Sequence, residues 1–240
     1  MPKSIMMGDI PLPWVDGWNH LGNELNRNDL CWQGSSHLDH DTNNKRRKFI
    51  GKYYSLRQEF GFLKPDMFLK IINIYATSFY GSNVWSLSSP GSEKLYVSWN
   101  RMIRNTWNVP NTTHRYLIEH ISNSNHIKLC IFKRYLTFIN SLKTSKKKRL
   151  ASLANIVSKD KHSITCQNLD YISEECNLDA HTVNPCDILQ SEYHEVPDDE
   201  VWRVHAIKEL LEIRNGELTL GNDQFSKNDI SDMIDLLATT

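Results

Sequence analysis

Residues 45–60 read KRRKFIGKYYSLRQEF, and this stretch sets the pattern for most of the chain. Its large apolar side chains recur three or four positions apart, which is the spacing of one face of an α-helix. Basic side chains spread around the remaining surface, and Gly61 follows where the end of a helix favours glycine. The stretch therefore predicts a basic, amphipathic helix over about residues 39–60. The apolar face consists of Phe49, Ile50, Tyr53, Leu56 and Phe60.

The same spacing continues downstream and predicts a mainly α-helical chain. Pro65 suits the first turn of a second helix, which Gly81 ends. Near the C-terminus, an acidic run at residues 198–200 and a capping box of Ser226 with Asp229 open a last pair of helices. The helices expected between these ends cover about residues 92–107, 112–122, 125–143 and 146–158.

Two regions depart from the helical pattern. Gly8-Asp9 lies between short apolar runs, which predicts a short N-terminal β-hairpin. Residues 161–197 show little periodicity and many polar side chains, so we expect an acidic, partly disordered linker. The expected domains are a hairpin segment (1–37), a basic helical domain (38–160), the acidic linker (161–197) and a C-terminal helical pair (198–240).

Charge is distributed unevenly along a chain whose net charge is zero. Residues 41–161 hold 22 lysines and arginines against 6 acidic residues, whereas residues 162–240 hold 4 basic and 17 acidic residues. This asymmetry is typical of a nucleic-acid contact surface, because lysine and arginine neutralise phosphates. The alternative is a lysine-rich bundle without such a partner, since charge statistics bear on partners and not on fold. A further hypothesis is that the acidic end folds back on the basic body and blocks it.

The sequence contains no recognisable catalytic site. Polymerases and nucleases hold divalent metal with clustered carboxylates, but residues 42–158 contain four scattered acids. P-loop and nucleophile-elbow motifs are absent. Cys166, Cys176 and Cys186 recur every ten residues near His162 and His181, a pattern for which we expect free thiols and keep a zinc site as the alternative. We expect a binding module without a metal or cofactor of its own.

Four motifs follow one another along the first two thirds of the chain. They are Trp18-Asn19-His20-Leu21-Gly22-Asn23, Ser78-Phe79-Tyr80-Gly81-Ser82 with Trp85, Trp99-Asn100-Arg101-Met102-Ile103-Arg104, and Lys133-Arg134-Tyr135. In this order and spacing they resemble the region downstream of the active site in reverse transcriptases of non-LTR (LINE-type) retrotransposons. The first resembles the primer-grip turn of that family, and the second resembles its thumb signature. Pro2-Lys3-Ser4 is similar to the end of its preceding palm motif. The alternative is that these are ordinary turns, helix caps and core residues.

The resemblance covers residues 2–160, and weakly 198–214, and it implies a thumb-like domain that lies along an RNA–DNA duplex. The family's catalytic aspartate motif, its fingers and its endonuclease domain have no counterpart here. We therefore expect a fragment of an RNA-directed DNA polymerase that is inactive by itself, with Mg²⁺ belonging to the missing palm. Its partners would be the primer–template duplex and the missing palm and fingers. The expected contact residues are His20, Leu21, Gly22, Lys45, Arg46, Arg47, Lys48, Lys52, Arg101, Arg104, Lys133, Arg134, Lys146, Lys147, Lys148 and Arg149.

The alternative function is a domesticated module, derived from such an element, that binds nucleic acid or another protein. No run approaches the roughly 20 apolar residues that a membrane helix needs, and the first residues lack the apolar run of a signal peptide. We therefore expect an intracellular protein, nuclear or cytoplasmic, without a membrane partner.

Overall fold

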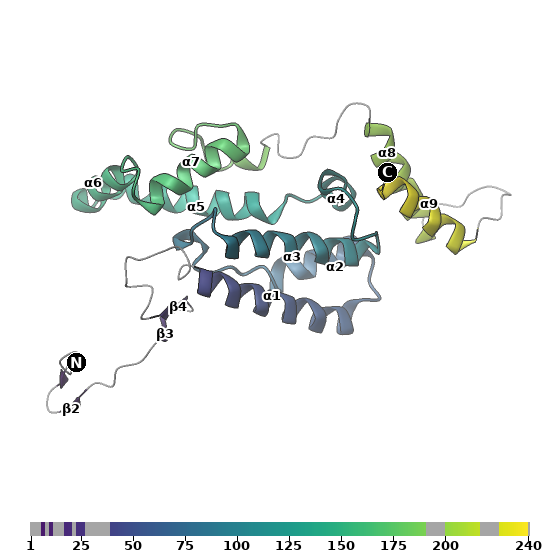
Figure 1. Ribbon diagram of the computed structural model, residues 1–240, viewed down its shortest axis with the longest axis horizontal. Coiled ribbons are helices and arrows are strands. Elements are labelled where there is room, and N and C mark those ends of the chain that lie inside the picture. Colours follow the sequence, from purple (N-terminus) through teal and green to yellow (C-terminus); the bar gives the residue numbers. More distant parts are fainter. Residues whose placement is uncertain are drawn as a thin grey trace.

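The computed structural model describes residues 39–190, 200–216 and 226–239, together with the backbone of short strands between residues 6 and 26. Within the described residues, α1 to α5 form a central bundle, with α6 and α7 toward one end and α8 and α9 at the other (Figure 1). The helices are α1 (Asp39–Phe60), α2 (Pro65–Tyr75), η2 (Ser82–Val84), α3 (Pro90–Trp107), α4 (Arg115–Ser122), α5 (Ile127–Lys143), α6 (Lys148–Val157), α7 (Ile164–Cys176), η3 (Asp187–Gln190), α8 (Val201–Arg214) and α9 (Lys227–Thr239), where η marks a 3₁₀ helix.

The core is aromatic where α1 packs against α3. The Phe49 ring centroid lies 5.8 Å from that of Phe79 and 5.9 Å from that of Trp99. The Phe79 and Trp85 centroids are 6.1 Å apart. All four side chains are buried, and tilted aromatic pairs at these separations are favourable. The loop after α2, which carries Phe79 and Trp85, is therefore anchored in the core.

Local sequence signals set several helix ends. Pro65 occupies the first turn of α2, where the absent N–H would have no helical partner. Ser89 caps α3 by accepting a hydrogen bond from the backbone N–H of Ser92. At α9, Asp229 Oδ2 accepts from the Ser226 N–H at 2.8 Å, and Ser226 Oγ accepts from the Asp229 N–H at 3.2 Å. This reciprocal pair confirms the predicted capping box.

The second helix is shorter than the sequence predicts. It ends at Tyr75, whereas the apolar spacing continues to Phe79. The Thr77 hydroxyl donates to the Asn73 carbonyl at 2.6 Å just beyond the helix. Gly81 then adopts a φ of 88°, and the chain turns there. Phe79 is buried as the spacing predicts, but it reaches the core from a loop.

The expected N-terminal β-hairpin is wrong as a part of the fold. From Asp39 to Gln190 the described chain contains no β-strand, and helices with their connecting loops supply the described core. Among the residues described before α1, the backbone forms separate two-stranded antiparallel ladders, and an isolated two-stranded hairpin is marginal in water. In the described part of the chain the fold is therefore α-helical without a sheet layer. The ladders pair β1 (Met6–Met7) with β2 (Ile10–Pro11), and β3 (Gly17–His20) with β4 (Asn23–Asn26).

The expected disorder after residue 160 is also wrong for the described residues. Helix α7 lies in this region, and its Cys166, Leu169, Ile172 and Cys176 side chains are buried. These positions have helical spacing, and a buried cysteine packs as a small apolar residue. The segment read as a linker therefore contributes a packed helix.

A cluster of charges around the buried Lys128 joins α3, α5 and α7. Lys128 of α5 is 5% exposed, and its Nζ lies 2.7 Å from Glu175 of α7 and 3.7 Å from Glu93 of α3. Tyr171 donates a hydrogen bond to Glu93 Oε1 at 2.7 Å, and the Lys128 ammonium lies 4.9 Å from the centre of the Tyr171 ring. A buried charge needs such partners because its desolvation is otherwise costly. The cluster fixes α7 against the bundle.

The C-terminal helical pair packs beside the ends of α3 and α4. Arg214 of α8 donates to the carbonyls of Trp107 and Asn108, at 2.6 and 3.1 Å. The Tyr116 hydroxyl of α4 hydrogen-bonds to Glu200, just before α8. The helices α8 and α9 thus lie at the opposite end of the molecule from α6 (Figure 1).

Candidate nucleic-acid interface

A groove of about 790 Å³ lies between the loop that follows α2 and one face of α5. The loop contributes residues 78–83, and Leu189 of η3 completes the lining. The groove brings together two motifs that lie far apart in the sequence, Tyr80-Gly81-Ser82 and Lys133-Arg134. The α5 side chains that line it, spaced three or four positions apart, are Cys130, Lys133, Arg134, Thr137, Phe138 and Ser141.

The loop presents one aromatic ring to solvent. Tyr80 is 59% exposed, so the face of its ring is available for stacking on a base. The next residue, Gly81, has the positive φ that a residue with a Cβ adopts only at a cost. A glycine is thus required where the loop turns beside Tyr80.

Asn168 of α7 holds the far side of this loop. Its Oδ1 accepts from the Leu87 N–H at 2.9 Å, and its Nδ2 donates to the Trp85 carbonyl at 2.8 Å. The Trp85 indole N–H donates to Asp41 Oδ2 at 2.8 Å. Trp85 and Asn168 are both buried. Of the three aromatic residues in this motif, Phe79 and Trp85 are buried in the core and Tyr80 is exposed.

Cations from two helices flank the chain just before the groove. Arg134 Nη1 of α5 donates to the Thr77 carbonyl at 3.4 Å, and Lys52 Nζ of α1 donates to the Tyr75 carbonyl at 3.2 Å. Both basic side chains are exposed. The run at residues 146–149, just after the C-terminal end of α5, is also exposed. Basic residues therefore occur on α1, beside the groove and at the start of α6.

The other predicted contact residues fall into different settings. Arg104 is used inside the protein, since its Nε and Nη2 donate to the Thr113 carbonyl at 3.1 and 2.6 Å. Burial, together with nearby Arg115, lowers the pKa of Arg104. Arg101 is exposed on α3. On α1, Arg47 and Lys48 are exposed, whereas Lys45 and Arg46 are partly buried.

The predicted primer-grip residues cannot be placed in this interface. Leu21 and Gly22 lie outside the described residues, and of His20 the structure describes the backbone, within β3. Their part in binding stays a prediction.

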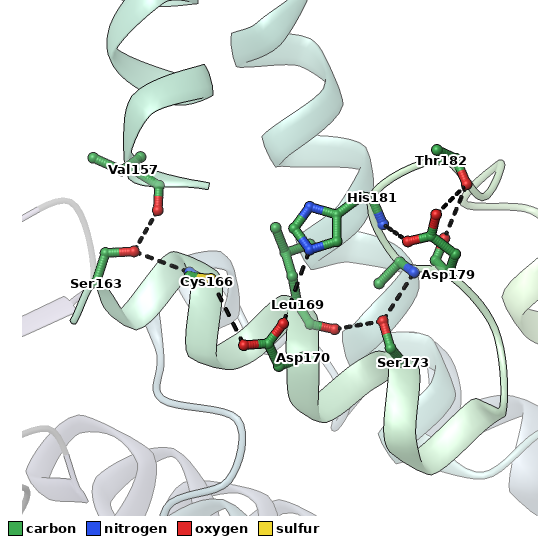
Figure 2. Close-up of polar contacts among 10 residues, drawn as sticks. Val157, Ser163, Cys166, Leu169, Asp170, Ser173, Asp179, His181 and Thr182 are labelled. Atoms are coloured by element: carbon green, nitrogen blue, oxygen red, sulfur yellow. Dashed lines mark hydrogen bonds and ion pairs between the residues drawn. The ribbon is translucent and has the colours of Figure 1, made fainter. Parts of the chain in front are cut away.

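A chain of Cys166, Asp170 and His181 lies on and beside α7 (Figure 2). Cys166 Sγ donates to Asp170 Oδ2 at 3.6 Å, and Asp170 Oδ1 lies 3.9 Å from His181 Nε2. A nucleophilic cysteine needs a base or a positive charge beside its sulfur. Here the carboxylate stands between the thiol and the imidazole, and burial together with Asp170 raises the pKa of Cys166. The arrangement stabilises α7 and does not activate the thiol.

The described residues offer no group of three or more His, Cys, Asp or Glu side chains that could hold a metal ion. In this part of the chain, Cys130, Cys166 and Cys186 are free cysteines. Within the same residues, no helix combines the length and the apolar character that a membrane crossing requires.

Sequence reasoning missed several parts of the groove. Thr137 and Ser141 follow Lys133 and Arg134 at helical spacing, so this face of α5 could have been found from the sequence. Leu189 and Asn168 could not, because their roles depend on how α7 and η3 pack.

Comparisons with protein-family models, with curated proteins and with solved structures found no match for this chain.

Proposed function

We propose that this chain is a helical nucleic-acid-binding module without catalytic activity of its own. The observation that carries the proposal is the groove, in which an exposed tyrosine and two cations of α5 face the same space. Cations bind phosphates regardless of sequence, and an aromatic ring stacks on any base. A polynucleotide satisfies both requirements.

The partner that we propose is an RNA–DNA primer–template duplex. Lys48 and Lys52 of α1, the two groove cations Lys133 and Arg134, and the basic run at residues 146–149 would contact its phosphates. Such contacts position a duplex and carry little sequence information. Tyr80 would stack on an end or an unpaired base, because stacking requires an exposed base face.

The ordered motifs support a narrower proposal, that the chain corresponds to the thumb side of a non-LTR retrotransposon reverse transcriptase. In that setting Mg²⁺ and the catalytic aspartates would belong to palm and fingers partners. The protein would act inside the cell, in the nucleus or the cytoplasm. The packing of Trp85 supports the proposed correspondence to the thumb, since Trp85 anchors the loop that presents Tyr80.

Charge reversal in the groove tests the proposal. The Lys133→Glu/Arg134→Glu variant should bind a fluorescent RNA–DNA hybrid about tenfold more weakly in an anisotropy titration. The matched control is Lys70→Glu/Lys94→Glu, which reverses two exposed cations that do not line the groove. Equal losses in both variants would show that net charge, and not the groove, determines binding.

Tyr80 separates stacking from charge. The Tyr80→Ala variant should bind a hybrid with a single-stranded overhang about fivefold more weakly or worse, whereas Tyr80→Phe should bind normally because the ring remains. If both substitutions leave the affinity unchanged, stacking at this position is ruled out.

The second candidate, a protein-interaction module, is favoured by a specific surface. Helix α6 exposes large apolar side chains next to its basic residues. Binding of single-stranded or duplex nucleic acid does not require such an apolar surface.

A further inference from the structure

One face of α6 combines apolar and basic side chains. Leu153 is 56% exposed and Ile156 is 62% exposed. They lie four and seven positions after Arg149, so the three side chains share one helix face. With Lys148 and Ser152 they line a shallow groove of about 470 Å³. Between residues 146 and 161 the sequence has six basic residues and one acid.

One face of α9 has the complementary composition. Leu236 is 63% exposed and Met233 is 37% exposed. Asp229 and Asp232 are exposed at positions that share this face by helical spacing. We call this surface the α9 strip (Asp229, Asp232, Met233 and Leu236) and the surface on α6 the α6 strip (Arg149, Leu153 and Ile156). Both strips have exposed apolar side chains, which lie beside acidic residues on α9 and beside basic residues on α6.

The two strips of one molecule do not meet. Helices α6 and α9 lie at opposite ends of the chain's long axis (Figure 1). Helix α8, which packs against α9, is held in place by the Arg214 hydrogen bonds to Trp107 and Asn108. The α6 strip of one molecule can therefore contact the α9 strip of another without rearrangement of either.

We propose that the α6 strip binds the α9 strip of a second copy of this chain. Complementary charge fixes the choice of partner and the register, and the apolar side chains supply the buried area. Because two different surfaces meet, the contact is heterologous and joins molecules head to tail. The proposal does not depend on nucleic-acid binding.

Another exposed apolar face does not identify a partner in this way. Met67 and Ile74 of α2 are exposed, but the acid Asp66 and the base Lys70 flank them. A face with both charges does not select a partner by charge complementarity.

The experiment is sedimentation velocity of the full chain, freed of nucleic acid, over a range of concentrations. Small interfaces give weak, transient association, so the mean mass should rise with concentration, and the rise should shrink in high salt. Arg149→Glu and Asp232→Lys should each weaken self-association about fivefold. An equimolar mixture of the two variants should associate as the native chain does, because the reversed charges again attract.

Two further variants complete the test. Leu153→Ser/Ile156→Ser should weaken association about tenfold, and both residues are already exposed, so folding should be retained. Lys94→Glu, an exposed residue of α3, is the control and should associate normally. A native chain that stays monomeric at all concentrations overturns the proposal. The proposal is also overturned if both charge-reversal variants associate as strongly as the native chain, or if association is not restored in their mixture.

Discussion

Helix α5 carries basic residues in two opposite settings. Lys128 in its first turn is buried between Glu93 and Glu175, whereas Lys133 and Arg134 line an open groove. The sequence counts all three equally toward the basic excess. The structure separates charge that holds helices together from charge that is accessible to a partner. A charge count therefore overstates a binding surface by the residues, such as Lys128 and Arg104, whose interactions are internal.

The largest expected difference between the two settings is in stability. Lys128→Ala removes a buried side chain that pairs with two partly exposed carboxylates and packs against aromatic rings, so the free energy of unfolding should fall by about 2–3 kcal/mol. Lys133→Ala should change it by less than about 0.5 kcal/mol. Urea unfolding followed by circular dichroism measures both. Similar values for the two variants would mean that the buried cluster adds nothing.

Asn168 links the buried region to the groove. Asn168→Leu leaves the Leu87 N–H and the Trp85 carbonyl without their side-chain partner and should cost about 2 kcal/mol of stability. Since these bonds hold the loop that presents Tyr80, binding of the hybrid should weaken as well. Gln167→Leu, at an exposed neighbouring position of α7, is the control. A stable variant with normal affinity would remove Asn168 from this role.

Glu119 extends the comparison because it is a partly buried acid without the partners that Lys128 has. Its Oε1 has no hydrogen bond, and burial raises its pKa to about 8 from the ordinary 4.5, although Arg115 opposes the shift. The folded protein then binds a proton that the unfolded chain releases between these pH values. Stability should therefore fall as pH rises from about 4.5 to 8.

Glu119→Gln removes this titration. The variant should exceed the native chain in stability by about 1–2 kcal/mol at pH 9, and by clearly less at pH 5. Thermal unfolding across this pH range measures the difference. Glu59→Gln, at an exposed position on α1, is the control, and its stability should depend on pH as that of the native chain does. If the stability of Glu119→Gln also followed the pH dependence of the native chain, the raised pKa of Glu119 would be contradicted.

Helical spacing predicted most of the bundle because its apolar side chains are local signals, as in α1 and α5. Pro65 and the Ser226/Asp229 box set their helix ends through neighbours in the sequence. Helix α7 was missed because two of its buried positions are cysteines. In addition, Asn168 finds its partners in the loop before α3, and Tyr171 finds its partner in α3. The loop after α2 escaped prediction for a related reason, since Phe79 keeps helical spacing without belonging to a helix.

The candidate groove could be predicted in part. Tyr80 and the Lys133-Arg134 pair were singled out from sequence motifs. Their proximity was not, because it depends on anchoring by Trp85 and Asn168. The internal hydrogen bonds of Arg104 could not be predicted either, since no local signal shows that its guanidinium reaches the Thr113 carbonyl. The part of Arg104 in binding stays a prediction.

The salt dependence of hybrid binding tests the central claim most directly. If the groove cations contact phosphates, the logarithm of the native chain's affinity should fall linearly with the logarithm of salt concentration, and the slope should be shallower by about 2 in Lys133→Glu/Arg134→Glu. The Lys128→Met variant, which removes a buried charge on the same helix, should keep the native slope if it folds. A native affinity that does not change with salt, or identical slopes for the native chain and the groove variant, would contradict the account.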